Sequence, residues 1–148
     1  TFMSFGFYIV PWFEGKGGRL KNILIEDIRL RQTDHFYKYT NPFLFRLGGR
    51  IDDITIKDIS IDSDDKDFLF LEVQKAKSDI DPEKDVTHIG QITLENVLLK
   101  GTASRPGQIL VGSHVDRLVM SEVRAVNHES DDLIAMKGNG KIEEIKIQ

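Results

Sequence analysis

The stretch IDDITIKDISI, residues 51–61, places apolar residues at its first, fourth, sixth, ninth and eleventh positions. The same pattern occurs four more times, the last time in truncated form, and successive copies start 26 to 38 residues apart. The copies begin at Leu20, Ile51, Ile89, Val115 and Ile142. Self-similarity of this kind is typical of repeat architectures, in which each unit buries its apolar face against the next.

Within each copy, apolar and polar residues alternate with the period of a half-buried β-strand. One polar residue interrupts the alternation at a fixed phase in four copies: Asp27, Asp58, Asn96 and Glu122. We predict a tight turn there, because Asp and Asn in particular tolerate left-handed backbone and form local hydrogen bonds. Short apolar runs between the copies predict one further strand per unit, at residues 7–10, 43–47, 68–73, 109–111 and 133–136.

The unit is therefore strand, turn, strand, turn, strand, which predicts an all-β protein: a right-handed parallel β-helix, or solenoid, of about five coils. We expect residues 1–148 to form a single domain, with loop insertions near 31–42 and 74–86. Because an end coil leaves its apolar face open, we also expect a longer β-helix of which this is a fragment, or another chain covering the end.

A leucine-rich repeat is the main alternative fold, because its unit begins with a similar apolar strand. Where that repeat needs Asn or Cys, this chain has Ile28, Ile59, Val97 and Val123. No segment between the copies has the 3.6-residue apolar stripe of a helix, so the sequence favours the β-helix.

The composition excludes several classes of partner. Apolar residues make up 40% of the chain and charged residues 30%, and the net charge of -4 argues against nucleic acid and anionic membrane surfaces. The longest apolar run, residues 5–13, is much shorter than the roughly 20 residues that span a bilayer. There are no cysteines, which excludes disulfides and thiolate metal sites.

Two segments resemble polygalacturonase-type glycoside hydrolases, which belong to the pectin-lyase-like superfamily of right-handed β-helices. Residues 129–138, ESDDLIAMKG, are similar to that family's Asp-Asp-Cys-Ile-Ala-Ile-Lys-Ser-Gly segment, and residues 109–113, ILVGS, to its Ile-Asp-Ile-Gly-Ser segment one coil earlier. The resemblance implies that Asp131 and Asp132 act on a glycosidic bond, for which a pair of carboxyl groups is needed. The chain departs from the family at residues 105–108, RPGQ, where another catalytic Asp would be expected.

Other residues are candidates for substrate binding. His114 and His128 lie near the resembling segments, and Lys137 lies within one of them. Tyr37, Tyr39 and Trp12 offer aromatic faces on which sugar rings can stack, although such residues can equally pack in a core or cover its end. No metal-ligand spacing is met, and we predict no metal site and no cofactor, while an oxygen-rich site near His114 and His128 stays open as an alternative.

Two functions follow as hypotheses. The first is a glycoside hydrolase-like protein that degrades a polysaccharide with Asp131 and Asp132. The alternative is a non-catalytic module that is structural or binds a host glycan, as in a phage tail spike or surface adhesin of the same fold. Both have a polysaccharide or cell-surface glycan as partner, allow a homotrimer or additional coils of the same protein, and predict an extracellular, cell-surface or virion location.

Overall fold

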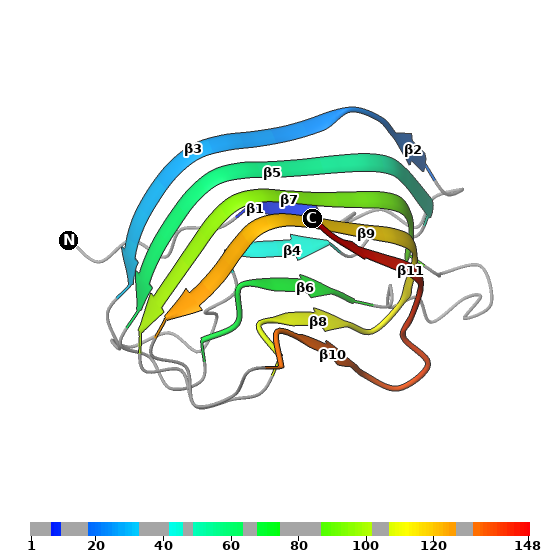
Figure 1. Ribbon diagram of the computed structural model, residues 1–148. Coiled ribbons are helices and arrows are strands. Elements are labelled where there is room, and N and C mark those ends of the chain that lie inside the picture. Colours follow the sequence, from blue (N-terminus) through cyan, green and yellow to red (C-terminus); the bar gives the residue numbers. More distant parts are fainter. Residues whose placement is uncertain are drawn as a thin grey trace.

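The computed structural model describes residues 7–9, 18–32, 42–45, 49–63, 68–74, 87–101, 107–126 and 132–148. These residues form eleven β-strands and no helix, which confirms the all-β prediction for the described part of the chain (Figure 1). The strands are β1 (Phe7–Ile9), β2 (Gly18–Leu20), β3 (Ile23–Gln32), β4 (Phe43–Phe45), β5 (Gly49–Ser63), β6 (Leu71–Val73), β7 (Thr87–Gly101), β8 (Ile109–Val111), β9 (His114–Val126), β10 (Ile134–Met136) and β11 (Lys141–Ile147).

The strands form two sheets, and every pairing is parallel. The short strands form a five-stranded sheet in the order β1-β4-β6-β8-β10. The longer strands, together with the short strand β2, form a six-stranded sheet in the order β11-β9-β7-β5-β2, with β3 also paired to β5, and we call it the long sheet. From β3 onward, short strands and long strands alternate along the chain, so each repeat contributes to both sheets (Figure 1). Strands that are neighbours in a sheet are therefore one repeat apart in the sequence.

The register of the long sheet aligns the repeats residue by residue. Ile54 of β5 is the partner of Ile23 on one side and of Ile92 on the other. Ile92 in turn pairs with Leu118, and Leu118 with Ile145. The stacking that the repeat predicted is confirmed at these positions, since one apolar residue from every copy lies in a single row.

The predicted left-handed residues are confirmed, but the turn is a bend within one strand. Asp27, Asp58, Asn96 and Glu122 have φ values of 58°, 55°, 49° and 54°. Strands β3, β5, β7 and β9 each continue through this residue, and Figure 1 shows that all four strands are curved. A single left-handed residue bends a strand without ending its pairing, so the two strands expected on either side of it are joined.

The core lies between the two sheets. Alternate residues of β5 and β7, such as Ile56 and Leu94, are fully buried. From the short sheet they meet Phe43, Phe45 and Val73, which belong to the same apolar cluster. Phe43 also packs edge to face against Phe70, with ring centroids 5.1 Å apart. Interdigitation of β-branched and aromatic residues from both sheets gives one continuous core.

The core is open at β11, the edge strand of the long sheet. Ile145 and Ile147 occupy the rows of the buried Leu118 and Met120, yet they are exposed. Two further predictions, the insertions near 31–42 and 74–86, lie mainly outside the described residues. The described part of the chain contains no helix of the length and hydropathy that crossing a bilayer requires.

Candidate functional site

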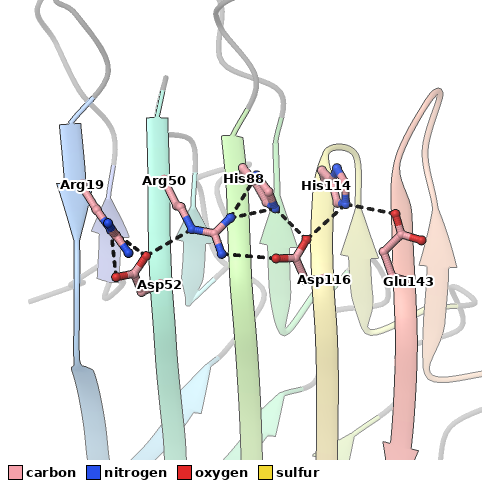
Figure 2. Close-up of polar contacts among 7 residues, drawn as sticks. All are labelled: Arg19, Arg50, Asp52, His88, His114, Asp116 and Glu143. Carbon is pink, nitrogen blue, oxygen red and sulfur yellow. Dashed lines mark hydrogen bonds and ion pairs between the residues drawn. The ribbon is translucent and has the colours of Figure 1, made fainter.

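A row of polar side chains crosses the outer face of the long sheet, opposite the core. It contains two residues from each of four strands, on either side of the inward-facing residue that starts each repeat, and we call it the polar ladder. Its side chains are those of Arg19, Arg50, Asp52, His88, His114, Asp116, Lys141 and Glu143, with Lys21 after β2, and Gly90 occupies the remaining position on β7. Figure 2 shows seven of these side chains in a single row across the strands.

The register of the strands produces the first column of the ladder. Arg19 is the partner of Arg50, and Arg50 is the partner of His88. His114 pairs with His88 on one side and with Lys141 on the other. Every repeat thus places a basic residue or a histidine at the same point, immediately before its first apolar residue.

The residue after the first apolar position of each repeat forms the second column of the ladder. Its carboxylates form ion pairs with the basic residues of the first column. Arg19 donates from Nε to both oxygens of Asp52, each 2.9 Å away. Arg50 donates from Nε to Oδ1 of the same carboxylate, at 3.1 Å. Lys21 Nζ lies 3.9 Å from Oδ2. Asp52 is therefore held between cations of two neighbouring repeats, and only 18% of its side chain is exposed.

Arg50 also reaches beyond the adjacent strand. Its Nη1 lies 3.1 Å from Nδ1 and 3.0 Å from Nε2 of His88, and its Nη2 donates to Oδ2 of Asp116 at 3.3 Å. Asp116 belongs to β9, so the guanidinium of β5 crosses β7. Gly90 is the ladder residue of β7 at the crossing, and a Cβ there would lie 3.0 Å from Nη2 of Arg50. The absence of a side chain at residue 90 leaves room for this contact.

Two histidines and two carboxylates form the centre of the ladder. The rings of His88 and His114 stack with centroids 4.5 Å apart and an interplanar angle of 22°. Oδ1 of Asp116 lies 2.6 Å from Nε2 of His88 and 3.3 Å from Nε2 of His114. Oε1 of Glu143 is 3.3 Å from the same His114 nitrogen, as Figure 2 shows. The same oxygen is 2.5 Å from Nζ of Lys141.

The cationic neighbours keep these carboxyl groups ionised. Burial raises the pKa of Asp116, but hydrogen bonds and charge from His88 and Arg50 outweigh it, and the net pKa is below the ordinary value. The pKa of Asp52 is lowered mainly by its hydrogen bond from Arg19. The pKa of Glu143 is lowered mainly by its hydrogen bond from Lys141. The ladder therefore offers both strong acceptors and strong donors at neutral pH.

Of the predicted site residues, His114, Asp132 and Lys137 lie in the described part of the chain. His114 belongs to the ladder on β9. Asp132 and Lys137 are both exposed and lie before and after β10 of the other sheet. Main-chain hydrogen bonds hold them next to the preceding repeat, from Gly107 N to Asp132 O at 2.8 Å and from Lys137 N to Val111 O at 2.9 Å. Five predicted residues, Asp131, His128, Tyr37, Tyr39 and Trp12, lie outside the described residues.

The sequence analysis did not predict the other residues of the ladder. His88 and His114 are 26 residues apart, so a search for metal-ligand or catalytic spacings passes over them. The signal was the repeat itself, because the residue before each first apolar position is Arg, Arg, His, His and Lys in turn. Comparing the polar residues at equal phase would have found the column.

Comparison with known proteins adds no relative. No family model, no curated protein and no solved structure matches the chain.

Proposed function

We propose that this chain is part of a right-handed parallel β-helix of the pectin-lyase-like kind that binds an extended polysaccharide or cell-surface glycan along the polar ladder. The observation that carries the proposal is the in-register placement of charged and imidazole side chains on successive strands of one sheet face. Such binding belongs to a protein that acts outside the cell, at a cell surface or on a virion.

The strand arrangement supports the β-helix. Successive strands alternate between two parallel sheets around a single core. Returning to the next parallel strand of the same sheet requires a crossover, and such crossovers are right-handed in nearly all proteins. Stacked repeats of this kind form a quasi-linear surface, on which equivalent residues recur at the strand spacing of about 4.8 Å.

The chemistry of the ladder supports a glycan as the ligand. Sugar hydroxyl groups both donate and accept hydrogen bonds, so a matching surface needs both kinds of partner. Arg50 and Lys141 supply donors, whereas Asp116 and Glu143 supply ionised acceptors. The mutual ion pairs hold these groups in place before binding, which lowers the entropic cost of ordering them. Because the row is linear, it fits an extended polymer better than a compact ligand.

A glycan array tests this proposal. The wild-type protein is expected to bind at least one polysaccharide, and Arg50→Ala should weaken that binding by at least about tenfold, as loss of a central Arg does at many interfaces. Lys100→Ala is the matched control, because Lys100 is an exposed cation at the far end of β7. Absence of glycan binding by the wild type, or equal binding by Arg50→Ala, would contradict the proposal.

Hydrolysis of the glycan is a second candidate function, favoured by one observation. The two segments that resemble polygalacturonases lie side by side, because β10 pairs with β8 and Ile109 N donates to Leu133 O at 2.8 Å. Gln108, in the segment where a further catalytic Asp would be expected, is buried and its Nε2 donates to Phe68 O at 3.1 Å. Gln108 carries an amide and no carboxyl group, so in this proposal the catalytic carboxyls are those of Asp131 and Asp132.

The test of this second function is cleavage of the bound glycan by the full chain. Asp131→Asn and Asp132→Asn should each abolish cleavage and leave thermal unfolding unchanged. Undiminished cleavage in both variants would refute the role of the two carboxyls.

A further inference from the structure

We propose that His88, His114 and Asp116 bind one divalent transition-metal ion, with zinc as the best match. The ligand atoms of these three residues all lie within 4.8 Å of one another. Two imidazoles and a carboxylate are a common ligand set for zinc and for other first-row metals. The inference depends on the geometry of these side chains, and it holds whether or not the ladder binds a glycan.

The two distances from the carboxylate are near those around a shared ion, and the distance between the histidine nitrogens is at most 4.8 Å. Zinc binds His nitrogen and carboxylate oxygen at about 2.0–2.2 Å, so two ligand atoms of a tetrahedral ion are about 3.4 Å apart. Oδ1 of Asp116 is already 3.3 Å from Nε2 of His114 and 2.6 Å from Nε2 of His88. The second distance has to widen, which a rotation of the partly exposed Asp116 side chain provides.

The two sheet strands hold the imidazoles in position. His88 and His114 are direct partners in the register of β7 and β9, and their rings stack. Both rings present Nε2 to the same carboxylate oxygen, as Figure 2 shows. Ligands on paired strands need little ordering on binding, and this favours affinity.

His114 is the clearest sign of a missing partner. Its Nε2 atom is buried and, among the described residues, has no hydrogen-bond partner. The carboxylates of Asp116 and Glu143 both lie 3.3 Å from it, within ion-pair distance, but neither forms a hydrogen bond with it. A metal ion shared with Asp116 would give this nitrogen a partner, whereas Glu143 is not among the residues whose ligand atoms all lie within 4.8 Å of one another.

Arg50 opposes the ion. Its Nη1 is 3.1 Å from Nδ1 of His88, and this nitrogen carries the proton when a neutral imidazole binds a metal through Nε2. Two donors would then face each other, and the guanidinium charge adds repulsion. Arg50 therefore has to turn away from His88 when the metal binds, and it can keep its hydrogen bond to Asp52. Removing Arg50 should consequently strengthen metal binding.

Titration of the full chain with zinc chloride, followed by calorimetry, tests the inference. One ion should bind per chain, and His114→Ala and Asp116→Asn should each weaken binding by at least about tenfold. Arg50→Ala should bind several-fold more tightly than the wild type. Glu144→Gln is the control, because this carboxylate on the same face binds Arg117 at 2.6 Å. With cobalt chloride, the wild type should give the visible absorption of a tetrahedral ion, and His114→Ala should not.

Thermal unfolding gives a second measurement on the same proteins. An ion that binds only the folded state raises the Tm. Zinc should raise the Tm of the wild type and leave that of His114→Ala unchanged. The inference is overturned if the wild type binds no zinc, or if His114→Ala and Asp116→Asn bind it as tightly as Glu144→Gln does.

Discussion

Arg50 and Asp116 form an ion pair of 3.3 Å although the strand β7 lies between the strands that carry them. The contact passes Gly90, where a Cβ would also lie 2.5 Å from the main-chain oxygen of Asp52. Because residue 90 has no side chain, Arg50 and Asp116, which belong to the repeats on either side, can form this ion pair. Asp52, Asp116 and Glu143 place carboxylates at this position of their repeats, whereas residue 90 is a glycine. The glycine leaves space for the side chain of Arg50 to pass.

We predict that Gly90→Ala destabilises the protein by about 1–3 kcal/mol, the usual cost of adding a methyl group to a packed site. Arg50→Ala is the matched comparison, because it removes the ion pair without adding atoms. It should cost at most about 1 kcal/mol, since Arg50 and Asp116 are partly exposed. Urea unfolding of both variants measures the difference, and equal stability of Gly90→Ala and wild type would contradict the close approach.

The left-handed bends give a second prediction. Asn96 donates from Nδ2 to Oδ1 of Asp58 at 2.8 Å, so two neighbouring bends are linked by their own side chains. Glu122 has the same conformation, with φ of 54°, but Glu is poorly suited to it. Glu122→Gly should therefore raise the free energy of unfolding by up to about 1 kcal/mol. Asn96→Gly should give a smaller gain or a loss, because it removes the hydrogen bond.

Chemical denaturation of the two glycine variants and of Glu122→Ala tests this. Glu122→Ala keeps the steric problem and should not be stabilised. Lower stability of Glu122→Gly than of Glu122→Ala would contradict the prediction.

The repeat, the sheet stacking and the left-handed residues could be predicted because they depend on local rules, whereas the turn expected at those residues is a bend within one strand. Alternating Ile residues specify a strand face, and a polar residue at a fixed phase specifies a left-handed position. The pairing of His88 with His114 was harder to predict from the sequence, because it depends on the register between repeats of unequal length. Asp132 and Lys137 were predicted from a resemblance, and the structure places them on the other sheet from His114, so the predicted site residues do not form one cluster.

The stacked apolar rows give a third prediction. Ile92 is 1% exposed and lies between Ile54 and Leu118 in its row. Ile92→Ala should lower the free energy of unfolding by about 2–5 kcal/mol, because the cavity is enclosed by neighbouring repeats. Lys100→Ala on the same strand should change it by less than about 0.5 kcal/mol. Guanidinium unfolding of both variants provides the measurement, and similar stability in the two would argue against a packed row.

Acid should weaken the ladder in a predictable direction. The pKa of Asp52 is lowered in the folded protein, chiefly by its hydrogen bond from Arg19. Its stabilising contribution is thus present above the ordinary carboxyl pKa of about 3.9 and is lost as the pH falls through the folded value. Asp52→Asn removes this contribution, so its stability should depend less on pH below about pH 4 than that of the wild type.

Urea unfolding at about pH 6 and about pH 3 measures the effect. Arg19→Ala removes the main partner of Asp52 and should flatten the pH dependence in the same direction. An unchanged pH dependence in both variants would mean that the Asp52 contacts do not persist in solution.

The central claim is that successive repeats bind successive parts of one glycan chain. The most direct measurement is the affinity of oligosaccharides of increasing length, prepared from the glycan that the array identifies. Affinity should rise with the length of the oligosaccharide until it covers the ladder residues of all five repeats, a span of roughly 19 Å, and then level off. A monosaccharide that binds as tightly as the longest oligosaccharide would contradict the claim.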